Sequence, residues 1–383
     1  MKIESVAVRT FRTTTNTMSD SDGHAHPGPE RQTTNALLEI TVDDGTVGRM
    51  VAGPSLLREE ILDKFVRPVL VGADPMRTEQ LYMGMYKWQR GSALNFTDQT
   101  LGVVDQALWD LKGKICGQPV WKLLGGYRDK IPAYGSTMCG DDMDGGLATP
   151  EDYGRFAEWM VKTRGYQAIK LHTWMPPIPG APDVKLDYAA CAAVREAVGP
   201  DIKLMLDPNH WYSRTDTLWL GQRLEELGYF WMEEPMEEAS ISSYVWLTEK
   251  LPRLNILGPE TAPGKYWTRA EWVRAGACDM LRTGARSAGG ITPSMKVAHL
   301  AESFHMSCEL HGTGVANLAI AAAIPNTHFY ERGLLHPFID YEQPRDYLNT
   351  LEDAMDAEGY VHLSNDPGLG QDLNLDYIEA NLA

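Results

Sequence analysis

LMLDPNH at residues 204–210, FWMEEP at residues 230–235 and ILGPET at residues 256–261 share one pattern, a short apolar run followed by a carboxylate. The carboxylates are Asp207, Glu233 and Glu260, and they lie 26 and 27 residues apart. That interval fits one strand plus one helix with its turns, so each step predicts one βα unit. Repeated βα units imply a parallel sheet.

The same alternation continues on both sides of these stretches. Further short apolar runs occur at residues 168–171 and 306–309, and helical patterns occur at residues 189–198 and 218–227. So many units over about 230 residues fit a closed barrel better than an open sheet. We therefore expect an α/β fold with a modified (β/α)8 TIM barrel over residues 131–364.

The first third of the chain has a different pattern. Residues 1–50 are typical of strands, with DDGT at residues 43–46 as a turn, and residues 56–125 are typical of helices. The polar stretch 18–32 is expected to be a loop, either a disordered connection or a mobile flap over a site. We predict an N-terminal α+β capping domain over residues 1–130, completed by residues from about 365 to 383.

Composition and charge exclude several classes of protein. The chain carries 35 Lys and Arg against 52 Asp and Glu, and its formal net charge of -17 argues against nucleic-acid binding. It has no run of about 18 apolar residues, so no membrane span is predicted. The N-terminus is typical of a strand and lacks the apolar core of a signal peptide. We expect a cytoplasmic protein. Because the chain is acidic, an anionic ligand would need local positive charge at its site.

The ends of the predicted strands carry the ionisable residues. In a barrel, the C-terminal ends of the strands form the active site, so Asp207, Glu233 and Glu260 should converge. Three carboxylates from three adjacent strands make a hard, oxygen-rich site that suits Mg²⁺. The alternative is three separate surface carboxylates near helix N-termini, but their repeated position favours the metal site.

Two other strands add basic groups. Lys170 and His172 lie two residues apart, so they share one face of their strand and point into the barrel mouth. Lys170 is either an ion-pair partner or, beside a divalent cation, a group with a lowered pKa that acts as a base or neutralises substrate charge. His311 would sit across the mouth as an acid or base, with Glu309 on the same face to orient its ring.

These residues and several longer motifs together resemble the mandelate racemase branch of the enolase superfamily, along essentially the whole chain. The motifs are VDQALWDLKGK at residues 104–114, GQP at 117–119, LLGG at 123–126, WMEEP at 231–235, SAGGIT at 287–292 and PGLG at 367–370. The resemblance implies the cap, the barrel and one Mg²⁺ held by Asp207, Glu233 and Glu260. It also implies a small-molecule carboxylate substrate and assembly into a homo-oligomer.

The resemblance implies roles for the remaining residues. The substrate carboxylate would bind the metal, and the metal with neighbouring cations would stabilise the enediolate formed when the α-proton leaves. His172 would replace the family's usual lysine base, and Lys170 would mainly contact the carboxylate. Asn209 matches a polar residue that follows the first metal ligand. Glu331 matches the glutamate that hydrogen-bonds the substrate carboxylate in mandelate racemase.

One position departs from the family pattern. Gly284 stands where the family has an aspartate, the partner of the histidine that matches His311. Asp279 lies at the start of the same strand and is expected to be too deep to replace it. His311 would then donate a proton, for example to a departing hydroxyl. Arg282, near the mouth, would contact an anionic substrate or Glu309.

The favoured reaction is dehydration of a sugar acid, an aldonate or aldarate, to a 2-keto-3-deoxy acid. His172 would remove the α-proton, and His311 or His210 would protonate the leaving 3-hydroxyl. The alternative is a racemase, epimerase or cycloisomerase, which needs competent groups on both faces and is weakened by Gly284. A non-catalytic barrel with a structural metal is disfavoured because ligands and bases are all present. The residues expected to contact substrate hydroxyls are Asp22, His24, His26, Glu30, Arg31, His210, Trp211 and Tyr212.

Overall fold

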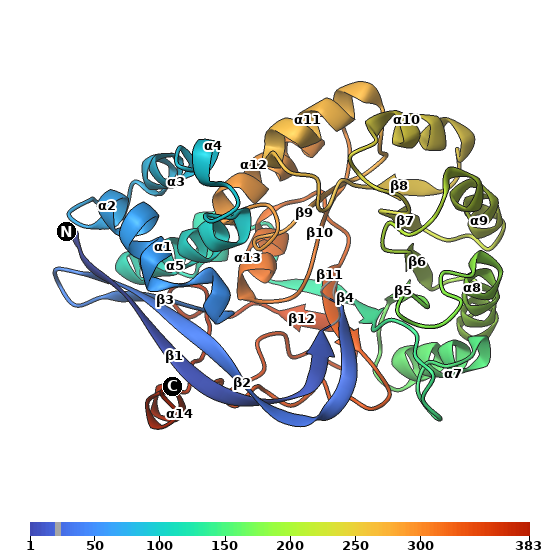
Figure 1. Cartoon of the computed structure of the whole chain (residues 1–383), viewed down its shortest axis with the longest axis horizontal. Helices are drawn as coiled ribbons and strands as arrows, with labels where there is room; N and C mark the ends of the chain where they lie inside the picture. Colours follow the sequence, from blue (N-terminus) through green and yellow to red (C-terminus); the bar gives the residue numbers. More distant parts are fainter. Residues whose placement is uncertain (20–23) are drawn as a thin grey trace.

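The computed structural model describes residues 1–19 and 24–383 of the chain. A cap built mainly from N-terminal residues lies beside a ring of alternating strands and helices (Figure 1). The cap sheet is antiparallel with the strand order β1-β2-β3. Its strands are β1 (Ile3–Ser19), β2 (Ala25–Val42) and β3 (Val47–Ala52). The predicted α/β fold with an α+β cap is confirmed.

The expectation of a loop over residues 18–32 is wrong where the structure describes this stretch, because residues 18–19 belong to β1 and residues 25–32 belong to β2. β1 and β2 form one long hairpin, whose ladder runs from the Ile3↔Val42 pair to the Ser19↔Ala25 pair. Polar residues here are compatible with a strand because much of the outer hairpin is partly or fully exposed, and threonine favours extended backbone. Asp22, predicted to contact substrate, lies outside the described residues.

The cap helices occupy the region in which a helical pattern was predicted. They are η1 (Pro54–Leu56), α1 (Glu59–Ile61), η2 (Leu62–Val66), α2 (Arg67–Leu70), α3 (Thr78–Tyr86), α4 (Gln89–Ser92), α5 (Asp98–Cys116) and α6 (Val120–Leu123). The longest, α5, begins where the Thr97 side chain accepts a hydrogen bond from Thr100 N, and it ends at Gly117, whose φ is 61°. Its apolar face packs in the core of the cap.

The barrel strands are β4 (Lys130–Thr137), β5 (Ala168–His172), β6 (Lys203–Asp207), β7 (Trp231–Glu233), β8 (Asn255–Leu257), β9 (Leu281–Thr283), β10 (Cys308–Leu310) and β11 (Tyr330–Leu335). Parallel pairing runs from β11 through β4 to β8, and β9 pairs with β10. The Leu257↔Met280 bridge joins the two groups. Cys308 N of β10 donates to Asn326 O, in the segment that precedes β11, at 2.7 Å.

Seven helices follow the barrel strands and surround them (Figure 1). They are α7 (Pro150–Lys162), α8 (Val184–Val198), α9 (Arg214–Glu226), α10 (Ile241–Lys250), α11 (Lys265–Ala275), α12 (Ile291–Ser303) and α13 (Val315–Ala323). Within the described part of the chain, no helix is both long and apolar enough to cross a membrane.

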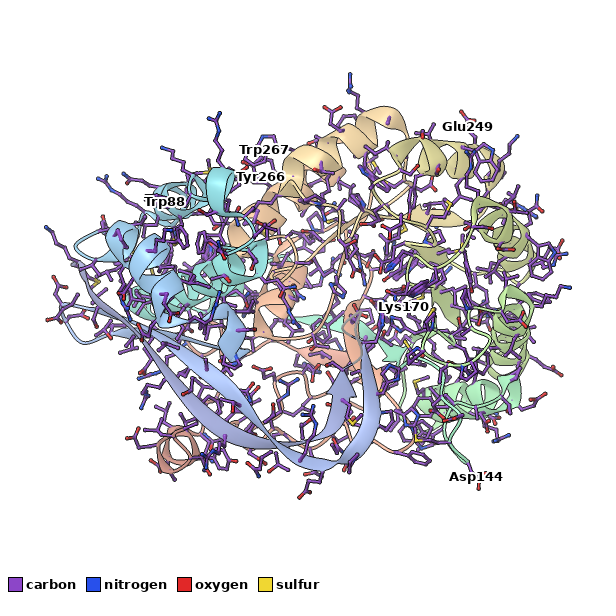
Figure 2. All side chains as sticks on the ribbon, viewed as in Figure 1. Trp88, Asp144, Lys170, Glu249, Tyr266 and Trp267 are labelled. Atoms are coloured by element: carbon purple, nitrogen blue, oxygen red, sulfur yellow. The ribbon has the colours of Figure 1, made fainter. Side chains whose placement is uncertain are left out.

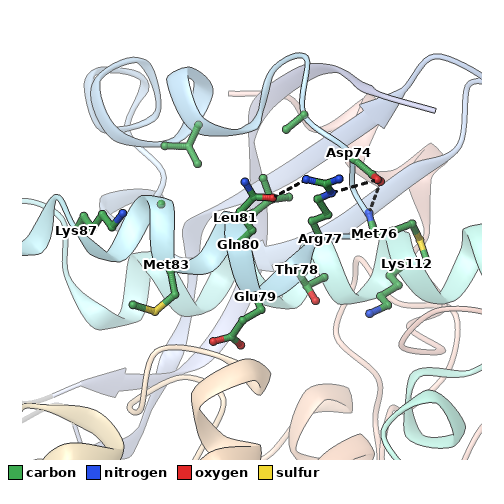
Figure 3. A pocket seen from close by; sticks show the side chains of 13 residues that line it. Asp74, Met76, Arg77, Thr78, Glu79, Gln80, Leu81, Met83, Lys87 and Lys112 are labelled. Atoms are coloured by element: carbon green, nitrogen blue, oxygen red, sulfur yellow. Dashed lines mark hydrogen bonds and ion pairs between the residues drawn. The ribbon is translucent and has the colours of Figure 1, made fainter.

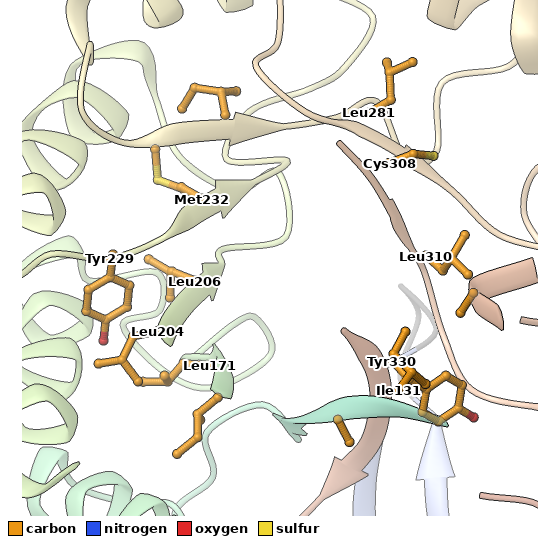
Figure 4. Packing of buried hydrophobic residues seen from close by; sticks show 14 of the residues in the cluster. Ile131, Leu171, Leu204, Leu206, Tyr229, Met232, Leu281, Cys308, Leu310 and Tyr330 are labelled. Carbon is orange, nitrogen blue, oxygen red and sulfur yellow. The ribbon is translucent and has the colours of Figure 1, made fainter. Parts of the chain in front are cut away.

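Alternation along the strands divides the side chains between two sides. Leu204 and Leu206 join the large core between strands and helices, where Figure 4 shows them with Leu171 and Met232. Met205 belongs instead to a small cluster inside the barrel. Because side chains alternate along a strand, the residues two positions beyond each inner residue also face inward. This register sends the charged strand ends into the barrel mouth.

The C-terminal segment returns to the cap, after β12 (Tyr360–His362) pairs with β4. Leu369 N donates to Asp110 Oδ1 on α5 at 2.9 Å, and α14 (Leu375–Ala380) follows. A second link joins α5 to α12, because Asp105 accepts hydrogen bonds from Thr292 N at 2.9 Å and Thr292 Oγ1 at 2.7 Å. These contacts explain why the motifs around residues 104–114, 287–292 and 367–370 occur together.

Candidate active site

Lys170 lies among carboxylates at the mouth of the barrel, and only 1% of the residue is exposed (Figure 2). Its Nζ lies 3.1 Å from Asp207 Oδ2 and 2.7 Å from Glu233 Oε1. A third carboxylate, that of Glu331, places Oε1 at 3.0 Å. Burial acts to lower the pKa of Lys170, but Glu233 and Glu331 outweigh it and hold that pKa well above its usual range. Lys170 in this setting is an ion-pair partner of three carboxylates, which is one of the two expected roles.

Negative charge exceeds positive charge in this site. Burial raises the pKa of Glu233 to about 7, although Arg282 and Lys170 oppose the shift. Burial also raises the pKa of Glu260 well above its usual range, again against Arg282. These two carboxylates therefore need more positive charge nearby than the protein supplies.

The donor set fits Mg²⁺ in its chemistry. Asp207, Glu233 and Glu260 supply hard oxygen ligands, and a divalent cation would meet the unbalanced charge. Two buried atoms in residues that closely follow Asp207 and Glu233 in the chain, Asn209 Nδ2 and Glu234 Oε2, have no hydrogen-bond partner among the described residues. Within that part of the chain, no three acidic, His or Cys side chains surround one point closely enough to hold a metal as they stand. The ammonium group of Lys170 and the guanidinium of Arg282 occupy the space between the carboxylate oxygens.

Glu238 braces the segment that carries Glu260, a role that the sequence analysis missed. Glu260 N donates to Glu238 Oε1 at 2.5 Å, and Thr261 N donates to Oε2 at 2.7 Å. Thr261 Oγ1 and Ala262 N add hydrogen bonds to Oε2 of 3.0 and 2.8 Å. The sequence contains adjacent acidic residues here, Glu237 and Glu238, and no local pattern indicates which one is buried.

His172 is fixed at both its ring and its backbone. Its Nδ1 lies 2.7 Å from Thr137 O, and because a carbonyl only accepts, Nδ1 carries the proton. Its Nε2 faces Asp207 Oδ2 at 2.9 Å, and because this oxygen also only accepts, Nε2 is the donor when it carries a proton. Tyr153 Oη also donates to His172 O at 2.7 Å. These contacts hold the ring at the mouth of the barrel with Nε2 against Asp207.

His311 lies in the mouth as predicted, but Glu309 does not orient it. His311 Nε2 lies 3.1 Å from Glu260 Oε1, and 37% of the side chain is exposed. Glu309 Oε1 instead lies 2.6 Å from His328 Nδ1 and accepts from His328 N at 3.1 Å. Glu309 and His311 share an inner face of the barrel, but Glu309 lies one layer deeper. Thr327 Oγ1 also donates to Glu309, so this carboxylate braces the segment before β11.

Arg282 lies deeper than expected and does not contact Glu309 in any described interaction. Its guanidinium is fully buried and lies 3.1 Å from Glu233 Oε1 and 3.3 Å from Glu260 Oε2. It also lies 3.0 Å from Glu331 Oε2, which accepts a hydrogen bond from Gly312 N at 2.7 Å. Asp279, as expected, is remote from this site, since its Oδ2 accepts from Ile256 N. Arg282 and Glu331 thus connect the carboxylates with the loop after β10.

The hairpin of the cap reaches this site. The ring centroid of His24 lies 6.2 Å from that of His172, and His26 pairs with Met18 in the hairpin ladder. Glu30 and Arg31 are exposed further along β2. Arg31 donates to Thr17 O across the hairpin at 3.2 Å.

The segment after β6 divides between the rim of the mouth and the core. His210 Nε2 lies 4.0 Å from Glu237 Oε1, and its ring stacks on Trp211 with centroids 5.4 Å apart. Asn209 is buried, and its backbone N donates to Asp207 Oδ1 at 3.1 Å. Tyr212 was expected to contact substrate, but it is buried and its hydroxyl donates to Asp187 Oδ2 at 2.6 Å.

A surface hollow lies elsewhere, on the cap. It has a volume of about 920 Å³ and is lined by residues between Val69 and Lys87 and by Lys112. Figure 3 shows Arg77, Asp74 and Glu79 on its walls. None of the residues predicted for the active site lines it.

Comparison with known proteins matches both domains of the chain. Residues 12–125 match the N-terminal domain model of mandelate racemase / muconate lactonizing enzyme, and residues 152–377 match the enolase C-terminal domain-like model. The crystal structure of D-glucarate dehydratase from Agrobacterium tumefaciens complexed with magnesium is 58% identical, with a TM-score of 0.98 over 100% of this chain and 99% of that one.

Two further relatives are less similar. D-galactarolactone cycloisomerase from Agrobacterium fabrum is 31% identical over 363 residues, which cover 90% of each chain. Arabinonate dehydratase from Saccharolobus solfataricus is 29% identical over 354 residues, which cover 87% of this chain and 86% of the relative. The family models and these relatives span most of the chain, which therefore belongs to the mandelate racemase / muconate lactonizing enzyme family of the enolase superfamily.

Proposed function

We propose that the chain is a Mg²⁺-dependent dehydratase of a sugar acid, and that its substrate is a hexaric acid such as D-glucarate. The observation that carries the proposal is the pair of unlike histidines at the mouth. Thr137 O holds the His172 ring through Nδ1 and its Nε2 faces Asp207, while His311 faces Glu260 without a paired aspartate. The 58% identity to a D-glucarate dehydratase supports the substrate class.

In this reaction His172 Nε2 takes the proton from C2, and the electrons of the C–H bond move toward the substrate carboxylate. Asp207, Glu233 and Glu260 would hold Mg²⁺. When bound, Mg²⁺ supplies positive charge that stabilises the negative charge developing on the carboxylate. Lys170 holds the carboxylate through its ammonium group, and this contact strengthens as charge develops.

The second step removes the 3-hydroxyl. His311 donates its proton to that oxygen, the C3–O bond breaks and water leaves, while the electron pair forms a C2–C3 double bond. The enol that results moves a proton from its 2-hydroxyl to C3. The product is a 2-keto-3-deoxy acid plus one water. Asn209, His24, His26, His210 and Trp211 are proposed to contact the substrate, with His210 as the second candidate for the acid.

A second candidate reaction is cycloisomerisation, with racemisation and epimerisation in the same class. The observation that favours it is the 31% identity to a D-galactarolactone cycloisomerase. These reactions share the C2 proton abstraction but conserve the elements of water over the whole reaction. The product therefore separates the two proposals.

The proposal is tested by incubating the protein with a panel of aldarates and aldonates, with Mg²⁺ or with EDTA. We expect a 2-keto acid from one aldarate, formed only with Mg²⁺. Glu233→Gln should lose both Mg²⁺ binding and turnover, because it removes one charged ligand. Retained turnover in Glu233→Gln, or turnover unaffected by EDTA, would refute the metal-assisted reaction.

Assembly and location are proposed from the sequence and the family resemblance. We propose a cytoplasmic homo-oligomer that acts on a small carboxylate and binds neither nucleic acid nor membrane. Light scattering on the purified protein measures its mass, and a value equal to one chain of 42.7 kDa would contradict the homo-oligomer.

A further inference from the structure

The backbone of His311 is held by a single buried amide side chain. Asn317, in the first turn of α13, donates from Nδ2 to His311 O at 2.7 Å and to Gly312 O at 2.8 Å. Its Oδ1 accepts from Ala285 N at 2.9 Å. Only 3% of Asn317 is exposed, so these three bonds are made away from solvent. One side chain therefore ties the loop after β10 to the loop after β9.

Gly284, which follows β9, also packs against the backbone of His311. A Cβ atom added at Gly284 would lie 2.7 Å from His311 O. Non-bonded atoms do not approach this closely, and the blocking atom belongs to the backbone, so it has no rotamer by which to move away. His311 N also donates to Thr283 O at 2.7 Å. The position that lacks the family's aspartate is therefore the position against which the His311 backbone packs.

The His311 ring depends on this backbone support. Its Nε2 faces Glu260 Oε1 at 3.1 Å. Its Nδ1 has no hydrogen-bond partner in the part of the chain that the structure describes. A ring with a carboxylate on Nδ1 would be oriented by that partner. Here the position of the His311 main chain determines the position of the ring.

We propose that Asn317 and Gly284 are positioning residues that hold His311 where it protonates the leaving 3-hydroxyl. The inference rests on the proposed dehydratase function. This chain lacks the family's aspartate, and the contacts of Asn317 and Gly284 form a clamp on the His311 main chain in its place. Loss of the clamp should slow the protonation step and leave the proton abstraction by His172 in place.

The test compares two rates in each variant, dehydration and exchange of the C2 proton with D₂O. Dehydration is followed by 2-keto acid formation and exchange by NMR, both with D-glucarate and Mg²⁺. In Asn317→Ala we expect kcat for dehydration to fall at least about 10-fold, because a small displacement of a catalytic group has large effects. KM should change less than about twofold, and the ratio of exchange to dehydration should rise.

Asn326→Ala is the matched control. Asn326 Nδ2 also donates to two backbone carbonyls, Ala298 O at 3.0 Å and Met306 O at 3.2 Å. It lies beside the opposite end of β10, where its carbonyl accepts from Cys308 N. This variant should lose stability and keep the wild-type ratio of exchange to dehydration.

Gly284→Ala perturbs the clamp from its other side with one methyl group. It should raise the same ratio, and it provides the test if Asn317→Ala does not fold. The inference is overturned if the ratio in Asn317→Ala or Gly284→Ala equals that in Asn326→Ala. A wild-type protein that forms no 2-keto acid would instead overturn the proposed function, and the inference with it.

Discussion

Glu238→Gln tests how the structure builds the site around Glu260. The Glu238 carboxylate accepts hydrogen bonds from Glu260 N at 2.5 Å and from the side chain and backbone of Thr261 at 3.0 and 2.7 Å. Ala262 N donates to it at 2.8 Å. All four groups donate, so both carboxylate oxygens must accept.

A glutamine at 238 cannot satisfy all these donors, because one of its two polar atoms is an NH₂ group. The best orientation keeps the amide oxygen at the Oε2 position and turns the NH₂ group toward Glu260 N. One buried N–H then loses its acceptor, and the remaining bonds lose charge assistance. The expected loss of stability is about 2–4 kcal/mol.

Glu260 should also become a poorer ligand in this variant, because its backbone is no longer fixed. We expect Mg²⁺ affinity to fall about 10-fold, the lower end for groups that support metal ligands. Urea unfolding measures the stability and calorimetric titration with Mg²⁺ measures the affinity.

Glu237→Gln is the control for this prediction, since the Glu237 side chain is 77% exposed. It should match the wild type in both measurements. The reasoning is refuted if Glu238→Gln and Glu237→Gln have the same stability and the same Mg²⁺ affinity.

Three further predictions concern other parts of the chain. His172→Asn should stop exchange of the C2 proton in D₂O, and undiminished exchange would move the base to another residue. Burial raises the pKa of Asp187 from 3.8 to about 7, so the folded state holds this proton more tightly and stability falls as pH rises from about 4 to 7. That loss of stability is at most about 4 kcal/mol. In urea unfolding, the free energy of unfolding of Asp187→Asn should decrease less between pH 5 and pH 8 than that of the wild type. Asp105→Ala leaves the buried Thr292 N–H without its acceptor and should lower the free energy of unfolding by about 1–3 kcal/mol. Equal urea midpoints for this variant and the wild type would contradict the prediction.

The sequence could predict which strand ends meet, because that follows from two simple periodicities. Side chains alternate along a strand, so Lys170 and His172 share a face. The βα repeat brings Asp207, Glu233 and Glu260 to one end of the barrel. Both features depend on local spacing and need no knowledge of side-chain partners.

Partners across the barrel could not be predicted in the same way. Glu309 and His311 share a face, yet Glu309 reaches His328, because the depth along the barrel axis decides which groups meet. Arg282 was expected near the mouth, in contact with a substrate or Glu309, but it is fully buried and pairs with three carboxylates. Such pairings depend on the stagger between strands, which has no signature in a single strand.

The hairpin was missed for a different reason. The described residues of this stretch, 18–19 and 25–32, are mostly polar and at least partly exposed, and polar composition is also common in loops. The pairing of Met18 with His26 is decided by the opposite strand. Only a partner strand distinguishes this extended segment from a loop.

The most direct test of the central claim is an NMR spectrum of D-glucarate in D₂O with the protein and Mg²⁺. We predict loss of one water per substrate and a 2-keto-3-deoxy acid that carries deuterium at C3, with no reaction after EDTA treatment. Deuterium at C2 in a substrate or its epimer without loss of water would contradict the dehydratase. It would place this chain with the isomerases of its family.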